Sequence, residues 1–322
     1  MEKPLVSVIT PCYNGEKFLN RYFESILSQT YSNIELIFIN DGSMDRTEEI
    51  VLAYTEELRD KGIRYIYEYQ ENQGQAAALN RGLKLFSGDY LTWPDSDDVM
   101  KPECIEKKVD FLLKNQSYQM VRSNGICYSE STGGKKRICD FEKAKNEDIF
   151  HELLVVATYG CCGCYLIAAD LFKKIYPDRN IMISRYGQNW QVLVPASSYT
   201  RCGYIDEDLY IVYEHDDSHS RKDNNPLVNI DRWEGFTEIV IDAINRSNCD
   251  REVCRKRVLE NCAKNQFYFA IDSRNIMLMR KFYCKMKLNG GASLKNTLLY
   301  TKVMCSSKFA EIVRTIRGGK DN

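Results

Sequence analysis

The stretch that decides the fold is Gly88-Asp89-Tyr90-Leu91-Thr92-Trp93-Pro94-Asp95-Ser96-Asp97-Asp98. Its apolar part predicts a short buried strand, and that strand ends in three closely spaced carboxylates. Like charges repel and an unpaired buried charge is costly, so such a group needs a positive partner. A hard divalent cation held by oxygen ligands is the simplest one. The alternative is a solvated acidic turn in which Asp98 caps the next helix.

Before this stretch, short apolar runs alternate with helical repeats. Predicted strands cover residues 5–10, 34–39, 63–67 and 90–93, and predicted helices cover residues 16–29, 47–58 and 76–86. This alternation predicts βαβ units and a parallel sheet, whose ligands bind at the carboxyl ends of the strands. Each predicted strand is followed there by polar or glycine residues: Tyr13 and Asn14, then Asp41, then Asn72 and Gly74, then Asp95 and Asp97. The first hundred residues are therefore predicted to bind a nucleotide.

Two common classes of nucleotide-binding protein are disfavoured. No Gly-x-Gly-x-x-Gly follows the first predicted strand, and the chain has no Gly-Lys-Ser/Thr phosphate loop. A nucleotide whose diphosphate is neutralised by a metal at Asp95 and Asp97 fits the pattern better. In that interpretation Asp41 accepts a hydrogen bond from a nucleobase N–H group.

Four ordered motifs resemble family 2 glycosyltransferases of the GT-A fold. They are residues 6–15, residues 39–43, the group Asn72-Gln73-Gly74 with Asn80 and Gly82, and Gly88-Asp89-Tyr90 leading to residues 95–98. The resemblance implies an α/β protein with a mostly parallel central sheet flanked by helices, followed by a helical C-terminal extension. It also implies inverting transfer of a sugar from a nucleotide-diphospho-sugar, with a UDP-sugar as the first expectation, to an acceptor hydroxyl.

The resemblance also implies the site residues. Nucleotide-sugar contacts are expected from Pro11, Tyr13, Asn14, Glu16, Asp41, Gly74, Asn80, Asp95, Ser96 and Arg221. A Mn²⁺ or Mg²⁺ ion is expected on Asp97, with Asp95 and His215 as further ligands, because a Lewis acid there stabilises the departing nucleoside diphosphate. For His215 and Arg221 the alternative is a polar loop at the rim of the site.

One segment departs from the family pattern. Family members commonly carry an acidic pair near residue 188, and its Asp deprotonates the acceptor hydroxyl. This chain has Gln188 and Asn189, neutral amides that orient a hydroxyl but cannot take its proton. Three interpretations remain: another carboxylate acts, the acceptor needs little base, or the chain binds a nucleotide-sugar without transferring it. The nearest carboxylates are Asp216 and Asp217, with residues 206–208 behind them.

The C-terminal part of the sequence is basic and helical. Residues 246–322 contain 17 Lys and Arg against 6 Asp and Glu, whereas the whole chain is balanced at 44 against 45. The overall balance argues against nucleic acid as a partner. A basic amphipathic helical segment at residues 294–316 fits an anionic membrane surface or, more simply, helices with a solvated basic face.

Cysteine usage bears on the expected location. The thirteen cysteines are odd in number and no export signal or stretch of 18 apolar residues occurs, which predicts reduced thiols in a cytoplasmic protein, peripheral on the inner membrane face if the basic helices bind lipid. The motif Cys161-Cys162-Gly163-Cys164 lacks the second pair that a zinc site needs.

These expectations combine into a predicted organisation and function. Residues 1–100 form the donor-binding half of the GT-A domain, residues 101–225 its acceptor-binding half, and residues 226–322 a basic helical extension. The acceptor is a glycan or lipid-linked molecule of a surface polysaccharide or glycolipid. The alternatives are a silent sugar-nucleotide-binding scaffold and, with less support, a nucleotidyltransferase, whose phosphate-binding cations are missing from residues 11–15.

Overall fold

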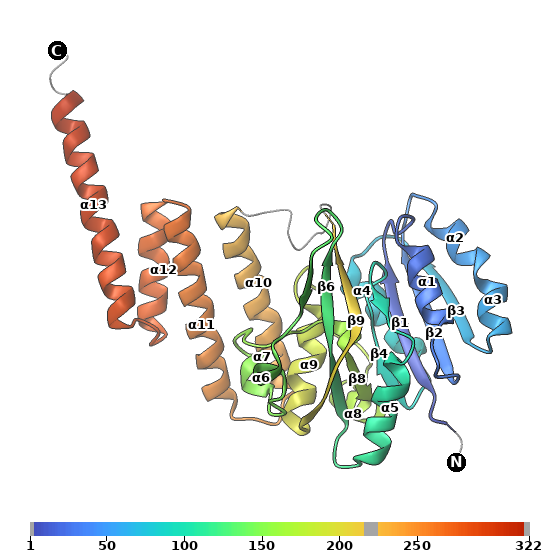
Figure 1. The fold of residues 1–322 in the computed structure, drawn as a ribbon. Coiled ribbons are helices and arrows are strands. Elements are labelled where there is room, and N and C mark those ends of the chain that lie inside the picture. The colour runs from blue at the N-terminus through green and yellow to red at the C-terminus, as the bar shows by residue number, and fades with distance from the viewer. Residues whose placement is uncertain (1–2, 216–224, 319–322) are drawn as a thin grey trace. The chain divides into compact units, whose positions relative to one another are not determined.

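The computed structural model describes residues 3–215 and 225–318, with the last twelve as backbone only. The chain divides into two compact units (Figure 1). The first unit comprises residues 1–222 and 238–251, and the second comprises residues 223–237 and 252–322. Both predicted halves of the GT-A domain therefore belong to one unit. The predicted boundary at residue 100 stays a prediction about which half binds which substrate.

The first unit is built on one sheet in the order β3-β2-β1-β4-β8-β6-β9-β5, with β7 paired to β6. The strands are β1 (Val6–Cys12), β2 (Ile34–Asp41), β3 (Arg64–Gln70), β4 (Tyr90–Thr92), β5 (Val99–Met100), β6 (Met120–Ser129), β7 (Lys135–Arg137), β8 (Tyr165–Ala168) and β9 (Cys202–Glu214). Among the nine strands of the described residues, β5, β7 and β8 run against the other six. The predicted mostly parallel sheet is confirmed.

The four predicted N-terminal strands are β1 to β4, and helices connect them. These are α1 (Leu19–Leu27), α2 (Thr47–Ala53), α3 (Thr55–Asp60) and α4 (Gln75–Leu85). The single helix predicted over residues 47–58 is two helices that meet at Tyr54. Gly82 allows α4 to pack closely on the sheet, since a Cβ there would lie 2.2 Å from the Ile9 side chain. Every residue of β1 and β2 is buried, which places the core under these two strands.

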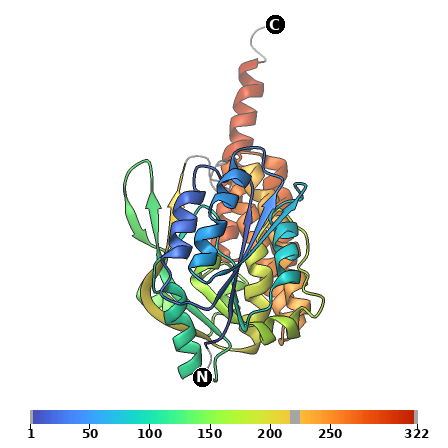
Figure 2. The same cartoon turned by 90° about the vertical axis from the view of Figure 1, so that its right-hand side faces the viewer.

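The rest of the first unit mixes short helices with the antiparallel strands. It contains α5 (Cys104–Lys114), α6 (Phe141–Ala144), α7 (Phe150–Leu153), the 3₁₀ helix η1 (Cys162–Cys164), α8 (Ala169–Ile175) and α9 (Gln188–Tyr199). The β6–β7 hairpin, green in Figure 2, stands out from the sheet. The register between β6 and β9 shifts around Asn124, where the chain forms a bulge.

The second unit is helical, as the sequence predicts. It contains the start of α10 (Pro226–Asn245), most of α11 (Arg251–Asp272), α12 (Ile276–Leu288) and α13 (Leu294–Gly318). Its core is made by Ala263, Phe267, Ala270, Met279, Phe282 and Met286. Asn275 caps α12, because its side chain accepts hydrogen bonds from the Met277 and Leu278 N–H groups. The helical C-terminal extension is therefore confirmed.

Candidate functional site

The carboxyl ends of β1, β2 and β4 lie side by side, and the predicted site residues follow them. Asp41, at the end of β2, is only 2% exposed. Its Oδ1 accepts hydrogen bonds from Gln70 Nε2 (2.7 Å) and Gln73 N (3.0 Å), and its Oδ2 accepts one from Gly74 N (2.9 Å). Asp41 therefore fixes the loop that enters α4, and Oδ2 retains capacity for a second donor.

The loop after β1 is joined to the loop after β2 by backbone-to-side-chain hydrogen bonds. Asn14 N donates to Ser43 Oγ (2.9 Å), and Asn14 Oδ1 accepts from Met44 N (2.9 Å). Glu16 Oε2 accepts from Arg46 N (3.1 Å). Asn14 and Glu16 thus shape the two loops, whereas the Tyr13 side chain is 43% exposed. Pro11 is buried in β1.

The acidic turn after β4 is held by surrounding elements. Asp95 Oδ1 accepts from Gln75 Nε2 (2.8 Å) and its Oδ2 from Cys162 Sγ (3.3 Å). Asp98 is 4% exposed, and its Oδ1 accepts from Tyr213 N (3.0 Å) on β9. The alternative in which Asp98 caps the next helix is wrong, because α5 begins at Cys104 and Asp98 binds β9 instead.

Asp97, the predicted metal ligand, lies against His215. Its Oδ2 lies 3.4 Å from His215 Nε2, and the other imidazole nitrogen, Nδ1, is buried without a hydrogen-bond partner among the described residues. The Phe18 ring contacts the imidazole edge-on, with centroids 4.4 Å apart. His215 and Asp97 therefore lie close together, and their role as metal ligands stays a prediction.

A guanidinium from α1 supports the same turn. Arg21 Nη2 and Nε donate to the Asp97 carbonyl oxygen at 2.7 and 3.2 Å, and Nη1 pairs with Glu130. The guanidinium lies 3.7 Å from the centroid of the Tyr213 ring. Arg21 thereby ties the acidic turn to the end of β6 and to β9. The sequence reasoning missed this residue, because no motif marks it.

The carboxylates of the turn are electrostatically strained. Burial, followed by the negative charge of Asp97, raises the pKa of Asp95 from 3.8 to about 6. Burial also raises the pKa of Asp97, against the lowering effect of His215 and Arg21. The pKa of Asp98 lies well above its usual value through burial and the charges of Asp97 and Asp95. A bound cation would relieve this repulsion.

Asn189 lies next to the acidic turn. The Trp93 indole Nε1 donates to Asn189 Oδ1 at 2.9 Å, and Trp93 is 2% exposed. Because an indole N–H only donates, the orientation of the Asn189 amide is fixed and its other atom is the donor Nδ2. Gln188 is the first residue of α9, after Gly187 with a φ of 56°. Trp93 is thus a site residue that the sequence reasoning did not single out.

Asn80, a predicted nucleotide-sugar contact, is hydrogen-bonded to the loop before α9. Asn80 is 4% exposed, and its Oδ1 and Nδ2 bind the Ile181 N–H and carbonyl at 2.8 Å each. Its predicted direct contact with the nucleotide-sugar stays a prediction, and the structure shows the amide buried and hydrogen-bonded to Ile181. It holds the loop before α9 against α4.

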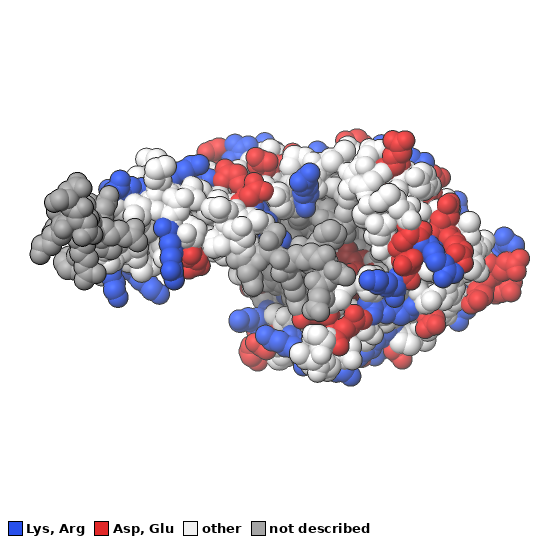
Figure 3. Space-filling view, turned by 90° about the horizontal axis from the view of Figure 1, so that it is seen from above, with Lys and Arg blue, Asp and Glu red and all other residues white. Residues whose placement is uncertain are grey.

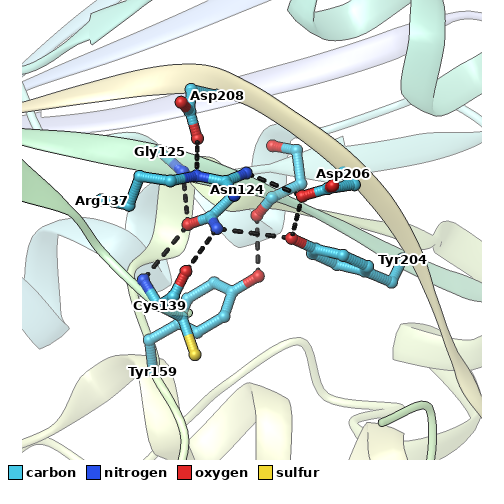
Figure 4. Close-up of polar contacts among 9 residues, drawn as sticks. Asn124, Gly125, Arg137, Cys139, Tyr159, Tyr204, Asp206 and Asp208 are labelled. Atoms are coloured by element: carbon cyan, nitrogen blue, oxygen red, sulfur yellow. Dashed lines mark hydrogen bonds and ion pairs between the residues drawn. The ribbon is translucent and has the colours of Figure 1, made fainter. Parts of the chain in front are cut away.

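The carboxylates of residues 206–208 are held in ion pairs. Arg137 donates to Asp206 Oδ1 and Asp208 Oδ1 at 2.7 Å each, within the polar network at the β6–β9 bulge (Figure 4). Glu207 pairs with Lys107. The pKa of Asp206 is lowered by Arg137, which makes it a poor base. The preferred base candidates, Asp216 and Asp217, and the predicted phosphate ligand Arg221 lie outside the described residues.

Comparison with known proteins decides the family. The model of the family described as glycosyl transferase family 2 matches residues 7–176. This chain belongs to glycosyl transferase family 2. A glycosyltransferase of Rickettsia typhi, itself uncharacterized, is 33% identical over 240 residues, which are 72% of this chain and 71% of the relative. The protein is therefore a glycosyltransferase, and this prediction is confirmed.

Solved structures of this glycosyltransferase's neighbours show the same fold. Residues 1–349 of TarS from S. aureus, in a complex with UDP-GlcNAc, superpose with a TM-score of 0.62 at 16% identity, over 95% of this chain and 92% of that one. The mannosyltransferase PcManGT from Pyrobaculum calidifontis, bound to GDP-Man and Mn²⁺, gives a TM-score of 0.57 at 14% identity, over 95% and 81% of the two chains. The GT-A fold is confirmed.

Within the described residues, no helix is both long and apolar enough to cross a bilayer.

Proposed function

We propose that this glycosyltransferase moves a sugar, with inversion, from a nucleotide-diphospho-sugar to an acceptor hydroxyl of a surface polysaccharide or glycolipid. The observation that carries the proposal is the acidic turn, whose Asp95 and Asp97 lie at the carboxyl end of β4 beside the loops after β1 and β2. The fold neighbour TarS binds UDP-GlcNAc, which supports a UDP-sugar as the first donor to test.

A divalent metal fits the residues of this turn. Asp97 Oδ2 and His215 Nε2 would hold it with Asp95, and the diphosphate and water would complete the oxygen-rich shell that Mn²⁺ and Mg²⁺ prefer. Among the described residues no three His, Cys, Asp or Glu side chains form a ready metal cage. We propose that oxygens of the donor complete the site. When bound, the ion supplies Lewis-acid stabilisation of the diphosphate leaving group. The Mn²⁺ in PcManGT supports this choice.

The nucleoside is proposed to lie over the loops after β1 and β2. The exposed Tyr13 ring supplies a face for stacking, next to Pro11. The second acceptor position of Asp41 Oδ2 suits a base N–H group. Ser96, between the two aspartates, is proposed to contact the ribose or diphosphate, and Gly74 keeps the entry to α4 free of a side chain.

The acceptor side contains an amide where the family carries a base. The Trp93 N–H group occupies Asn189 Oδ1, so Asn189 has its N–H donor left for the substrate. Asn189 is therefore proposed to orient the acceptor hydroxyl rather than deprotonate it. Gln188, one residue earlier, is proposed to assist. The proton is then taken by Asp216 or Asp217. Asp216→Asn and Asp217→Asn should be made separately; the true base should lose about 10²–10⁴ in kcat while its KM for the donor stays the same.

The donor and the metal are tested together by a melting-temperature panel. Nucleotide-sugars are added with Mn²⁺, with Mg²⁺ and with EDTA, because a ligand that binds only the folded state raises the melting temperature. One donor should stabilise the protein only with metal, and Asp97→Asn should abolish that shift. A shift of equal size in EDTA would contradict the metal site. A transfer assay with the selected donor then tests turnover.

A second function is favoured by one observation. Position 189 carries a neutral amide, held by Trp93, which cannot act as a base and so fits a protein that binds a nucleotide-sugar without transferring it. Metal-dependent donor binding with neither transfer nor slow hydrolysis would select this scaffold. Measurable transfer, lowered in either Asp216→Asn or Asp217→Asn, would eliminate it.

A further inference from the structure

The turn between α12 and α13 exposes an unusual group of leucines. Leu288, the last residue of α12, is 87% exposed; Leu294 and Leu298, on the first turns of α13, are 76% and 61% exposed. Leu294 and Leu298 are four residues apart and so share one face of the helix. We name Leu288, Leu294 and Leu298 the leucine tip. None of its residues belongs to the candidate site.

Hydrogen bonds and ring stacking hold the turn that carries the leucine tip. The Gly291 N–H donates to the Met286 carbonyl at 2.9 Å, and Gly290 adopts a φ of 81°. Asn296 is 2% exposed, and it accepts a hydrogen bond from the Tyr268 hydroxyl at 2.8 Å. Behind the turn, the Tyr283 and Tyr300 rings stack with centroids 3.9 Å apart. The leucines are therefore exposed on ordered backbone while neighbouring residues pack inward.

Three Lys side chains adjoin the tip, together with one Glu. Lys287 and Lys295 are exposed and directly adjoin Leu288 and Leu294 in the sequence. On α11, the Lys256 side chain comes within 3.7 Å of the Cβ position at Gly290, with Glu260 as the acidic neighbour at 3.0 Å. Helices α12 and α13 together contain nine Lys and Arg residues and one acidic residue, Glu311. Figure 3 shows the described surface from above, where Lys and Arg side chains are interspersed with Asp and Glu.

We infer that the leucine tip docks on an anionic phospholipid bilayer, with Lys256, Lys287 and Lys295 at the headgroups. Apolar residues ringed by Lys are the composition that enters the boundary between headgroups and acyl chains. Pairing with a second copy is disfavoured by charge. Helix α13 carries five Lys and Arg against one Glu, so two copies of it would repel each other. The inference goes beyond the proposed function and does not depend on donor or acceptor.

The test uses the full chain and vesicle flotation. Wild-type protein should float with vesicles of phosphatidylcholine mixed with phosphatidylglycerol, and much less with phosphatidylcholine alone. The variant L288S/L294S/L298S should bind the mixed vesicles at least about tenfold more weakly. The variant K287Q/K295Q should weaken binding by about fivefold for each Lys removed, and added salt should reduce this difference.

The matched control is Met277→Ser, because Met277 is 78% exposed at the opposite end of α12. It should bind vesicles as the wild type does, and all variants should keep the wild-type melting temperature. The inference is overturned if the triple variant floats like the wild type, if neutral vesicles bind equally well, or if no vesicle binds. It is also overturned if light scattering shows a wild-type dimer that the triple variant loses, since the tip would then be a self-interface.

Discussion

The three Asp residues of the acidic turn differ in how far hydrogen bonds within the protein already occupy their carboxylates. Asp98 is buried and bound to the β9 backbone, so it shapes the turn. Asp95 and Asp97 are partly exposed and carry raised pKa values, so they retain both access and a reason to bind a cation. The three neighbouring Asp residues thus separate into one structural side chain and two candidate metal ligands.

The cost of holding Asp95 ionised can be measured with Asp95→Asn. Its folded-state pKa is raised from 3.8 to about 6, so the protonated form favours folding, and this contribution is lost as the pH rises through that window. Without metal, Asp95→Asn should therefore melt higher than the wild type at pH 7, with a smaller difference near pH 4. Thermal melts at both values check this. With Mn²⁺ and donor the order should reverse; an unchanged gap would contradict the metal role.

The hydrogen bond between Trp93 and Asn189 predicts a strong energetic coupling. Asn189→Ala leaves a buried indole N–H without its acceptor, which costs about 1–3 kcal/mol of the free energy of unfolding. Trp93→Phe removes the donor, so adding Asn189→Ala to that background should cost much less. Urea denaturation of the four proteins of the cycle gives the coupling. Purely additive effects would show that the two side chains do not depend on each other.

At the scale of elements, helix α1 also holds the acidic turn. Its Arg21 binds the carbonyl of Asp97 through two N–H groups while the guanidinium packs on Tyr213. The start of α9 reaches the same turn through Asn189. Elements from both predicted halves of the domain therefore position the acidic turn. A substitution on α1 should accordingly weaken binding at the proposed metal site.

Arg21→Lys tests this support. Lys keeps the charge but lacks the planar fork that spans one carbonyl with two N–H groups. Donor affinity in the presence of Mn²⁺, measured by calorimetry, should fall by about tenfold, which corresponds to one lost hydrogen bond to a charged group. The control is Glu130→Gln, which removes only a partly exposed ion pair to the same Arg21 and should change little. Equal losses in both variants would assign the effect to the ion pair instead.

At the scale of the whole molecule, the chain has two cores. The first lies around β1 and β2, and the second around Phe267 on α11. Helix α10 contributes residues to both units. Each unit nevertheless buries its own apolar residues, which predicts that they can be destabilised separately.

Phe267→Ala tests whether the units are energetically separate. Phe267 is fully buried, so its truncation should cost the second unit about 3–5 kcal/mol through lost burial and a cavity. Calorimetric scans should show a lower transition for that unit, whereas donor binding at 25 °C stays at the wild-type value. Loss of donor binding in parallel with unfolding of the second unit would show that the molecule unfolds as one.

Much of the first unit could be predicted because its signals are local. Alternating apolar runs and helical repeats marked β1 to β4, and polar residues marked their carboxyl ends. The antiparallel strand β8 between β4 and β6 was not predictable in the same way, since pairing across the sheet depends on residues far apart in the chain. The break between α2 and α3 at Tyr54 could not be predicted either, because neither helix contains a Pro or Gly residue.

The sequence by itself determined the family, the parallel strands and the acidic turn, because short motifs and periodic burial encode them locally. Only the tertiary structure decided what each polar side chain faces. It placed Asn80 against Ile181, paired Asp206 and Asp208 with Arg137, and brought Trp93, Arg21 and His215 to the acidic turn. These contacts join residues distant in sequence, and their partners are fixed only when the sheet brings the strand ends together.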